Sequence, residues 1–342
     1  MESVWFMEVY TIKDVAKEAG VSIATVSRVI NKADNVNPAL RKKVLKVIEK
    51  LDYKPNRIAQ GLKSNTTNTI GIIISDISNP FFMRIIKEIE NIVHQEGYTL
   101  ILGSTDDSPQ KELEYIKLLY EKRIDALVIS STGENEDYLN ELQAAGMPIV
   151  FIDRRPVKNK FDSVYVDKVT ATYQMVKYLL EQNHRSIALT TGPRDIITNY
   201  DRYVGYTKAC YEFKLEINND YLKFGHFTVD FGKKSLKELL NLKKRPTAII
   251  SGSSLITKGI LIQANKDNLE IPKDFSLVSF GNISMNELIC PKMTYLEQMI
   301  HEIGKNSAEI LLNKLLGSKK GKKEIKLEAK IAMGDSVLNL KN

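Results

Sequence analysis

From Thr69 onward, short runs of Ile, Leu, Val and Ala alternate with longer segments in which apolar residues recur every three or four positions. The short runs are apolar throughout, which is typical of strands covered on both faces by helices, and therefore of parallel sheets. The predicted strands begin at Thr69, Tyr98, Asp125, Pro148, Ser186, Pro246 and Phe275. The predicted helices are centred near Glu88, Leu118, Leu139, Val176, Ala209, Leu239, Leu261 and Ala308. This order of strands and helices predicts an α/β fold of doubly wound parallel sheets.

The strands suit two sheets better than one, because the segment around Tyr165 and the tail at residues 323–333 add further candidates. We therefore expect two lobes within residues 69–338. The N-lobe is expected at about residues 69–165 and 296–320, and the C-lobe at about residues 166–293 and 321–338. In such folds, ligands bind at the carboxyl ends of the strands, in the crevice between the lobes.

Residues 10–55 show a different pattern, with the period of short amphipathic helices. The side chain of Thr11 suits an N-cap before a first helix at residues 12–19, and Gly20 suits the tight turn after it. A second helix is predicted over residues 22–30 or 23–30. A third begins at Pro38, where the missing amide hydrogen costs nothing. Its expected inward residues are Leu40, Val44, Val47, Ile48 and Leu51.

Positive charge is concentrated in the same part of the chain. The formal net charge of the whole chain is +7, and between residues 7 and 64 twelve lysines and arginines stand against six acids, a net charge of +6. Charge of one sign at one end favours a polyanionic partner such as DNA, although a solvated basic face is the simpler alternative.

The composition, 43% hydrophobic and 27% charged, is that of a globular protein, and no apolar run approaches the roughly 20 residues that cross a bilayer. Residues 1–9 form an N-terminal extension in which Met7 competes with Met1 as the natural start. Because this extension lacks the basic and apolar regions of a secretory signal, we expect a cytoplasmic protein without a membrane partner. The two cysteines, Cys210 and Cys290, suit a reducing compartment. No CxxC or paired-histidine spacing indicates a metal, and we expect no cofactor.

The stretch TIKDVAKEAGVSIATVSRVIN, residues 11–31, is the most specific motif in the chain. A helix-turn-helix requires a small residue where two helices meet, a glycine in the turn, and a polar second helix that lies in the major groove. Ala16 and Gly20 supply the first two, and the second predicted helix supplies the third. The stretch resembles the DNA-binding signature of the LacI/GalR family almost position by position. The resemblance implies a sequence-specific transcriptional regulator with an all-α headpiece at residues 10–55.

The resemblance also implies roles for individual residues. Ile23, Ala24 and Arg28 occupy the positions that read bases in the family. Arginine suits bidentate contact with guanine, whereas isoleucine and alanine offer only apolar contact. The residues better suited to phosphates are Thr25, Ser27 and Asn31, and Thr11 is a further candidate DNA contact.

The stretch YKPNRIAQGLKS, residues 53–64, has the composition of an ordinary linker, yet it resembles the family's hinge at Asn56, Ala59 and Leu62. In the family, the hinge helices of two subunits pair in the minor groove, and a leucine from each wedges into the central base step. Leu62 would be that wedge, with Lys63 beside it in the electronegative groove; otherwise Leu62 is an ordinary helix residue. We place the hinge at residues 56–68 and expect it to fold on DNA.

From residue 69 the chain resembles the sensor domain of the same family, which is similar to periplasmic sugar-binding proteins. The resemblance implies homodimerisation and a small-molecule effector bound between the lobes. The implied effector-binding residues are Phe81, Phe82, Asp153, Thr198, Arg202, Phe227, Ser253 and Asn282. Arg202 is the expected main anchor, whereas each aromatic residue has a role in the core as its alternative.

The chain departs from the sugar-binding members of the family at two positions. Where they carry an aspartate after a late strand, this chain has Gly281, and where they carry Asn or Thr followed by Asp, it has Ser253 and Ser254. Basic residues expected near the cleft are Arg154, Arg194 and His226. Because the cleft loses acids and keeps cations, the expected effector is a sugar acid or a phosphorylated sugar instead of a neutral hexose.

Other classes of function fit less well. The chain has no phosphate loop, no GxSxG elbow and no HExxH motif, so we do not expect an enzyme. A transport protein would need an export signal and no headpiece. Two hypotheses remain: a repressor of a carbohydrate-use operon that binds a pseudopalindromic operator and a small-molecule effector, and a family regulator controlled by a protein co-repressor.

Overall fold

The computed structural model describes residues 10–30, 36–53, 66–158, 160–283, 286–317 and 321–341, apart from the side chain at position 287. The chain divides into two compact units, Met1–Thr67 and Asn68–Asn342. Five predicted DNA contacts lie outside the described residues: Asn31, Asn56, Ala59, Leu62 and Lys63.

The first unit contains the three predicted helices, α1 (Ile12–Ala19), α2 (Ile23–Ile30) and α3 (Pro38–Lys50). Thr11 caps α1, because its backbone N–H and its hydroxyl both donate to Asp14 Oδ2, at 2.7 and 2.6 Å. Gly20 ends α1 with a φ of 61°, as expected of a glycine in this turn. Most of the predicted inward residues pack in one small core, but Leu40, in the first turn of α3, is 38% exposed and lies outside that core.

The N-lobe of the second unit holds a sheet in the order β11-β5-β4-β3-β1-β2, in which every neighbouring pair is parallel. Its strands are β1 (Thr69–Ile74), β2 (Thr99–Ser104), β3 (Ala126–Ile129), β4 (Ile149–Ile152), β5 (Asp162–Val166) and β11 (Glu324–Leu327). Its helices are α5 (Pro80–Val93), α6 (Pro109–Glu121), α7 (Glu136–Ala144) and α12 (Ile300–Leu315). Alternate strand residues pack on α5 and α12 on one face and on α6 and α7 on the other.

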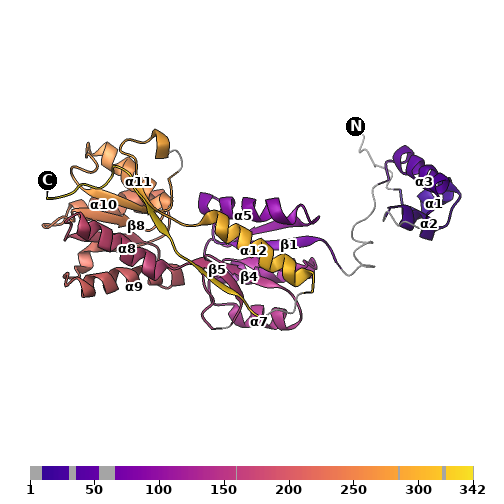
Figure 1. Ribbon diagram of the computed structural model, residues 1–342, viewed down its shortest axis with the longest axis horizontal. Helices are drawn as coiled ribbons and strands as arrows, with labels where there is room; N and C mark the ends of the chain where they lie inside the picture. The colour runs from indigo at the N-terminus through magenta and orange to yellow at the C-terminus, as the bar shows by residue number, and fades with distance from the viewer. Residues whose placement is uncertain are drawn as a thin grey trace, which may run out of the picture. The chain divides into compact units, whose positions relative to one another are not determined.

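The C-lobe holds a second sheet in the order β12-β10-β9-β8-β6-β7, parallel except for β12, which runs antiparallel to β10. Its strands are β6 (Ile187–Thr191), β7 (Leu222–Phe224), β8 (Ala248–Ser251), β9 (Ser276–Phe280), β10 (Thr294–Glu297) and β12 (Lys330–Ala332). Its helices are α8 (Lys168–Glu181), α9 (Ile197–Glu212), α10 (Val229–Leu240) and α11 (Ser254–Lys266), with short 3-10 turns at Asn219–Tyr221 and Asn286–Leu288. Figure 1 shows α8 and α9 on one side of this sheet and α10 and α11 on the other.

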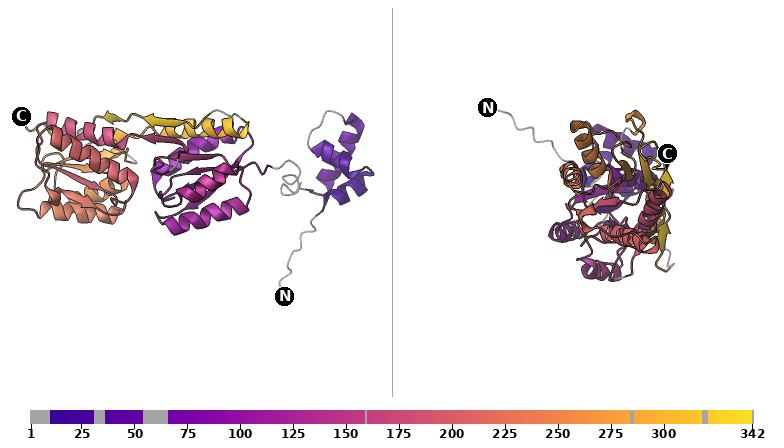
Figure 2. Two further views of the ribbon diagram at one scale, coloured as in Figure 1. Left: turned by 90° about the horizontal axis from the view of Figure 1, so that it is seen from below. Right: turned by 90° about the vertical axis from the view of Figure 1, so that its left-hand side faces the viewer.

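The chain passes between the lobes three times, which corrects the predicted lobe boundaries. We expected residues from 296 onward in the N-lobe and residues 321–338 in the C-lobe. Instead β10 pairs with β9 in the C-lobe, and β11 pairs with β5 in the N-lobe before β12 returns to the C-lobe. The yellow tail that runs along both lobes in Figure 2 is this last crossing. The sequence reading missed it because β10, β11 and β12 are short and largely polar.

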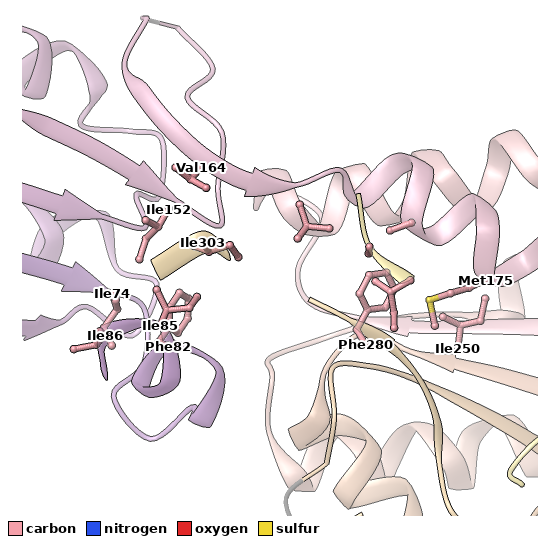
Figure 3. Close-up of a cluster of buried hydrophobic side chains, with 14 of the residues drawn as sticks. Ile74, Phe82, Ile85, Ile86, Ile152, Val164, Met175, Ile250, Phe280 and Ile303 are labelled. Carbon is pink, nitrogen blue, oxygen red and sulfur yellow. The ribbon is translucent and has the colours of Figure 1, made fainter. Parts of the chain in front are cut away.

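The apolar core follows both sheets. Figure 3 shows the side chains that gather in each lobe: Ile74, Phe82, Ile85, Ile86, Ile152, Val164 and Ile303 in the N-lobe, and Met175, Ile250 and Phe280 in the C-lobe. These residues come from the strands and from the helices that cover them, so the core fixes where the carboxyl ends of the strands lie.

His184 fixes the C-terminal tail to the C-lobe. Its Nε2 lies 3.0 Å from the carbonyl oxygen of Leu338, to which it donates, and its Nδ1 lies 2.9 Å from Thr247 Oγ1. Burial lowers the pKa of His184. The ring is therefore neutral in the folded protein at neutral pH.

We expect His184 to make the folded state less stable in acid. Since its pKa is lower in the folded than in the unfolded chain, protonation favours unfolding as the pH falls below about 6.5, by at most about 1.4 kcal/mol per pH unit. The substitution His184→Gln removes this contribution. Thermal unfolding at pH 7.5 and 5.5 should therefore show a smaller loss of Tm in the variant than in the wild type; an equal loss would contradict the assignment.

Candidate functional site

The outer face of α2 presents the predicted base-reading residues. Val26 and Val29 are buried in the core of the first unit, and the opposite face exposes Ile23, Ala24 and Arg28. Ile23 is 45% exposed, which is unusual for an isoleucine and is expected of a side chain that meets a partner. The first unit thus has a helix whose inner face is fixed by packing and whose outer face is free for contact.

The predicted phosphate contacts of α2 are partly occupied by the helix cap. Thr25 and Ser27 are half-buried. The Thr25 hydroxyl lies 2.9 Å from Ser22 Oγ, which also accepts from the backbone N–H of Thr25 at 3.1 Å. Ser22 is therefore the N-cap of α2, and Thr25 supports that cap. Thr11 is exposed, and its hydroxyl donates within the cap of α1.

A cavity of about 450 Å³ lies where the carboxyl ends of strands from both sheets meet. Its lining residues are Ser75, Asn79, Phe81, Phe82, Asp153, Arg154, Thr198, Arg202, Phe227, Gly252, Ser253, Ser254 and Gln298. The structure thus brings together seven of the eight predicted effector-binding residues, although no comparison tests their role. This is the position where folds with open parallel sheets bind ligands.

The aromatic wall of the cavity begins at the first turn of α5. Asn79 caps this helix, because its Oδ1 accepts from the backbone N–H of Phe81 at 3.1 Å, and Pro80 follows it. Phe81 and Phe82 pack edge to face with ring centroids 5.1 Å apart. Phe82 is 3% exposed and belongs to the N-lobe core, whereas Phe81 is half-buried and presents more of its ring.

Arg202 reaches the cavity from α9 and is 5% exposed. Its Nη1 donates to the carbonyl oxygen of Thr198 at 3.1 Å and to Asn199 Oδ1 at 3.0 Å. Its guanidinium carbon lies 4.6 Å from the ring centroid of Phe280 and 5.6 Å from that of Phe227. Burial lowers the pKa of Arg202 to about 10, so the group stays charged at neutral pH.

The buried Nε of Arg202 has no hydrogen-bond partner, and among the described residues no carboxylate forms an ion pair with it. An unsatisfied buried donor on a charged group is costly, and it is therefore a sign of a missing partner. The position and chemistry of Arg202 fit a ligand with a negatively charged or strongly accepting group.

Three other cations near the cavity have carboxylate partners. Lys168 Nζ donates to Asp153 Oδ1 at 3.0 Å, and Arg155 pairs with Asp201 through two hydrogen bonds of 3.1 and 3.2 Å. Both of these pairs join a residue that follows β4 in the N-lobe to a helix of the C-lobe. The third is Arg154, whose Nη2 lies 2.5 Å from an oxygen of Asp107. Burial of these charges requires such pairing.

Asn282 does not line the cavity, which corrects the eighth predicted position. It is exposed in the loop after β9, because Gly281 before it turns the backbone with a φ of 84°. The space beside Gly281 holds Gln298 instead: its Nε2 lies 2.6 Å from where a Cβ at position 281 would stand. Two further expectations were wrong, since neither Arg194 nor His226 lines the cavity, and Arg194 stacks on Tyr203 at 4.2 Å.

The sequence reading also missed lining residues that it had the means to find. Ser75 and Asn79 lie in the same ISDISNPFF stretch as the predicted phenylalanines, at the carboxyl end of β1. Gln298 follows β10, a strand that the reading did not predict, so no rule pointed to it. No group of His, Cys, Asp and Glu in the described part of the chain could hold a metal ion. None of the described helices is long and apolar enough to cross a membrane.

The geometry defines a class of protein: a helix-turn-helix unit followed by a two-lobed ligand-binding unit of parallel sheets. The sequence profile described as "Periplasmic binding proteins and sugar binding domain of LacI family" matches residues 67–332, and that of "Bacterial regulatory proteins, lacI family" matches residues 11–56. The chain belongs to the LacI family of bacterial transcriptional regulators.

Two relatives illustrate this membership. Catabolite control protein A of Priestia megaterium is 35% identical over 302 residues, which cover 88% of this chain and 91% of that protein. The HTH-type transcriptional repressor PurR of Vibrio parahaemolyticus is 32% identical over 331 residues, which cover 96% and 99%. These relatives are regulators and not enzymes.

Solved structures agree with the fold. A complex of the transcriptional regulator CelR with cellobiose is 26% identical with a TM-score of 0.71 and covers 96% of this chain and 99% of that one. The Lac repressor dimer bound to operator and an anti-inducer, 24% identical with a TM-score of 0.86 over 97% and 100% of the two chains, shows the fold alone.

We expect Gly281→Ala to cost more stability than Gly97→Ala. Both glycines have positive φ, 84° and 81°, so each substitution forces a left-handed alanine at a cost of roughly 1–2 kcal/mol. A Cβ at 97 meets nothing within 4 Å, whereas one at 281 meets Gln298. The lower Tm of Gly281→Ala should therefore rise when Gln298→Ala is added. Equal Tm values for the two single variants would show that Gln298 is free to move away.

Proposed function

We propose that this chain is a repressor of a carbohydrate-use operon that binds a pseudopalindromic operator as a homodimer, and that an anionic effector in the cavity controls it. The proposed effector is a sugar acid or a phosphorylated sugar. The family profile with its sugar-binding domain, and the cellobiose complex of CelR, support a carbohydrate ligand. One observation carries the choice of an anion, namely the buried and carboxylate-free guanidinium of Arg202.

The charge around the cavity supports the same choice. Asp153 is the single acidic residue among the lining residues, and Lys168 pairs with its carboxylate. The two positions at which sugar-binding relatives carry acids hold Gly281 and Ser254 here. A neutral hexose needs acceptors for its hydroxyl groups, whereas a carboxylate or phosphate matches the planar fork of an arginine. Selectivity against neutral sugars would thus come from missing acceptors.

Arg202→Ala tests the effector. Wild-type protein should be stabilised in a thermal-shift screen by sugar acids or sugar phosphates more than by the matching neutral sugars, because only charged ligands satisfy Arg202. The variant should lose this stabilisation while keeping its secondary structure. Arg194→Ala is the matched control, since it removes the same charge from the same segment without touching the cavity.

The opposite outcome has a clear meaning. If calorimetry shows that a neutral sugar binds the wild type more tightly than its acid or phosphate, the anionic effector is wrong. If no small molecule binds, the hypothesis of a protein co-repressor takes its place.

For DNA, we propose that Ile23, Ala24 and Arg28 read bases and that Thr11, Thr25, Ser27 and Asn31 contact phosphates. Exposure of the first three on one face of α2 supports this division. Asn56, Ala59, Leu62 and Lys63 are proposed to bind the minor groove as a hinge.

Arg28→Ala and Lys42→Ala separate the two kinds of contact. Removing a bidentate guanine contact should cost roughly 1–3 kcal/mol on the operator and much less on random DNA, so the ratio of the two affinities falls about 10- to 100-fold. Lys42 is exposed on α3, and its loss should weaken both affinities alike. Fluorescence anisotropy at fixed salt, with an operator obtained by selection from random DNA, measures both ratios. An unchanged ratio for Arg28→Ala would contradict the docking of α2.

A further inference from the structure

Arg154 is a second buried guanidinium in the cavity, and it comes from the opposite lobe to Arg202. It follows β4 in the N-lobe, is 3% exposed, and lines the cavity. Its Nη1 donates to the carbonyl oxygen of Ser131 at 3.3 Å, and its Nη2 pairs with Asp107. These contacts hold one edge of the guanidinium against the N-lobe.

The Nε of Arg154 remains without a partner, as does the Nε of Arg202, and both atoms are buried. The two side chains line one cavity, and the charge of Arg154 contributes to the lowered pKa of Arg202. Two like charges in a space poor in water repel one another more strongly than they would in solvent. The one carboxylate that pairs with Arg154, that of Asp107, is partly exposed and leaves the pair of guanidinium groups with a net positive charge.

We propose that Arg154 and Arg202 grip one anionic group of the effector from opposite lobes, so that this group is what allows the two lobes to close. The inference rests on the proposed function, because it requires an anionic effector, and it assigns a second anchor that the sequence reading did not. An anion between the two groups supplies acceptors for both free Nε donors and cancels the repulsion between the charges.

The backbone around Arg154 is built to hold it. Asp107 and Asp153 have φ values of 59° and 62°, in the left-handed region where aspartate is tolerated but costs energy. The first presents a carboxylate to Arg154, and the second turns the chain directly before it. Strained residues persist where surrounding contacts fix them, and they gather at functional sites.

The neighbours of Arg154 connect its position to the other lobe. Asp153 pairs with Lys168 at the start of α8, and Arg155 pairs with Asp201, which precedes Arg202 in α9. Residues 153–155 therefore contact the C-lobe on both sides of the guanidinium that faces the ligand. Closure that brings Arg154 to an anion would also form these two ion pairs.

Inorganic sulfate is the simplest probe, since it carries the charge without the sugar. The full chain is titrated with sodium sulfate against sodium chloride at equal ionic strength, and the rise in Tm gives the half-saturating concentration. Arg154→Gln should raise that concentration about ten- to hundredfold, the range expected for the loss of one charge-assisted hydrogen-bonded contact. Arg194→Gln, which removes a charge outside the cavity, should change it less than twofold.

A second variant covers a failure of Arg154→Gln to fold. Arg154→Lys keeps a positive charge beside Asp107 but loses the planar fork, and it should weaken sulfate about three- to tenfold. If sulfate stabilises the wild type and both Arg154 variants equally while Arg202→Gln abolishes the response, the two-sided grip is wrong and the anionic effector stands. If glucose binds the wild type better than gluconate and glucose 6-phosphate do, the proposed function itself fails.

Discussion

Charge buried at the meeting point of two lobes is the constraint on which this sensor depends. A guanidinium or a carboxylate away from water is tolerated only where hydrogen bonds and opposite charge replace its hydration. The protein satisfies this requirement for Lys168, Arg155 and the buried Glu112, which accepts hydrogen bonds from Ser131, Thr132 and Asn135. Arg202 is the exception, and its free donor faces the place where a ligand belongs.

The path of the chain determines which residues closure can move. The three passages between the lobes lie between β5 and α8, between β10 and α12, and between β11 and β12. Two of them carry residues of the site, because Lys168 opens α8 and Gln298 follows β10. Met299, in the same passage, has a φ of 50°. A rotation of the lobes therefore acts directly on side chains beside the ligand, and the coupling needs no longer route.

Much of this architecture could be predicted from the sequence, for reasons that differ between its parts. Helix α1 was predicted residue by residue, because Thr11 and Gly20 mark its ends chemically. Phe81, Thr198 and Arg202 were placed by resemblance, and the structure gathers them in one cavity. Asn282 failed because the direction of a side chain after a strand depends on the backbone, here on the positive φ of Gly281. The lobe boundaries failed because partners of β10 and β11 are distant in the sequence, and short polar strands carry no periodic signal of their own.

The contact between Gly281 and Gln298 links the fold to selectivity. Glycine is required at 281 twice, once by its φ of 84° and once by the amide that stands 2.6 Å from any Cβ there. An aspartate at this position would have to displace Gln298 before its carboxylate could accept from a sugar hydroxyl. The amide is neutral, so the wall opposite the arginine residues neither repels an anion nor offers the acceptor that a hexose needs. The preference for an acid ligand then arises from a backbone conformation as much as from Arg202.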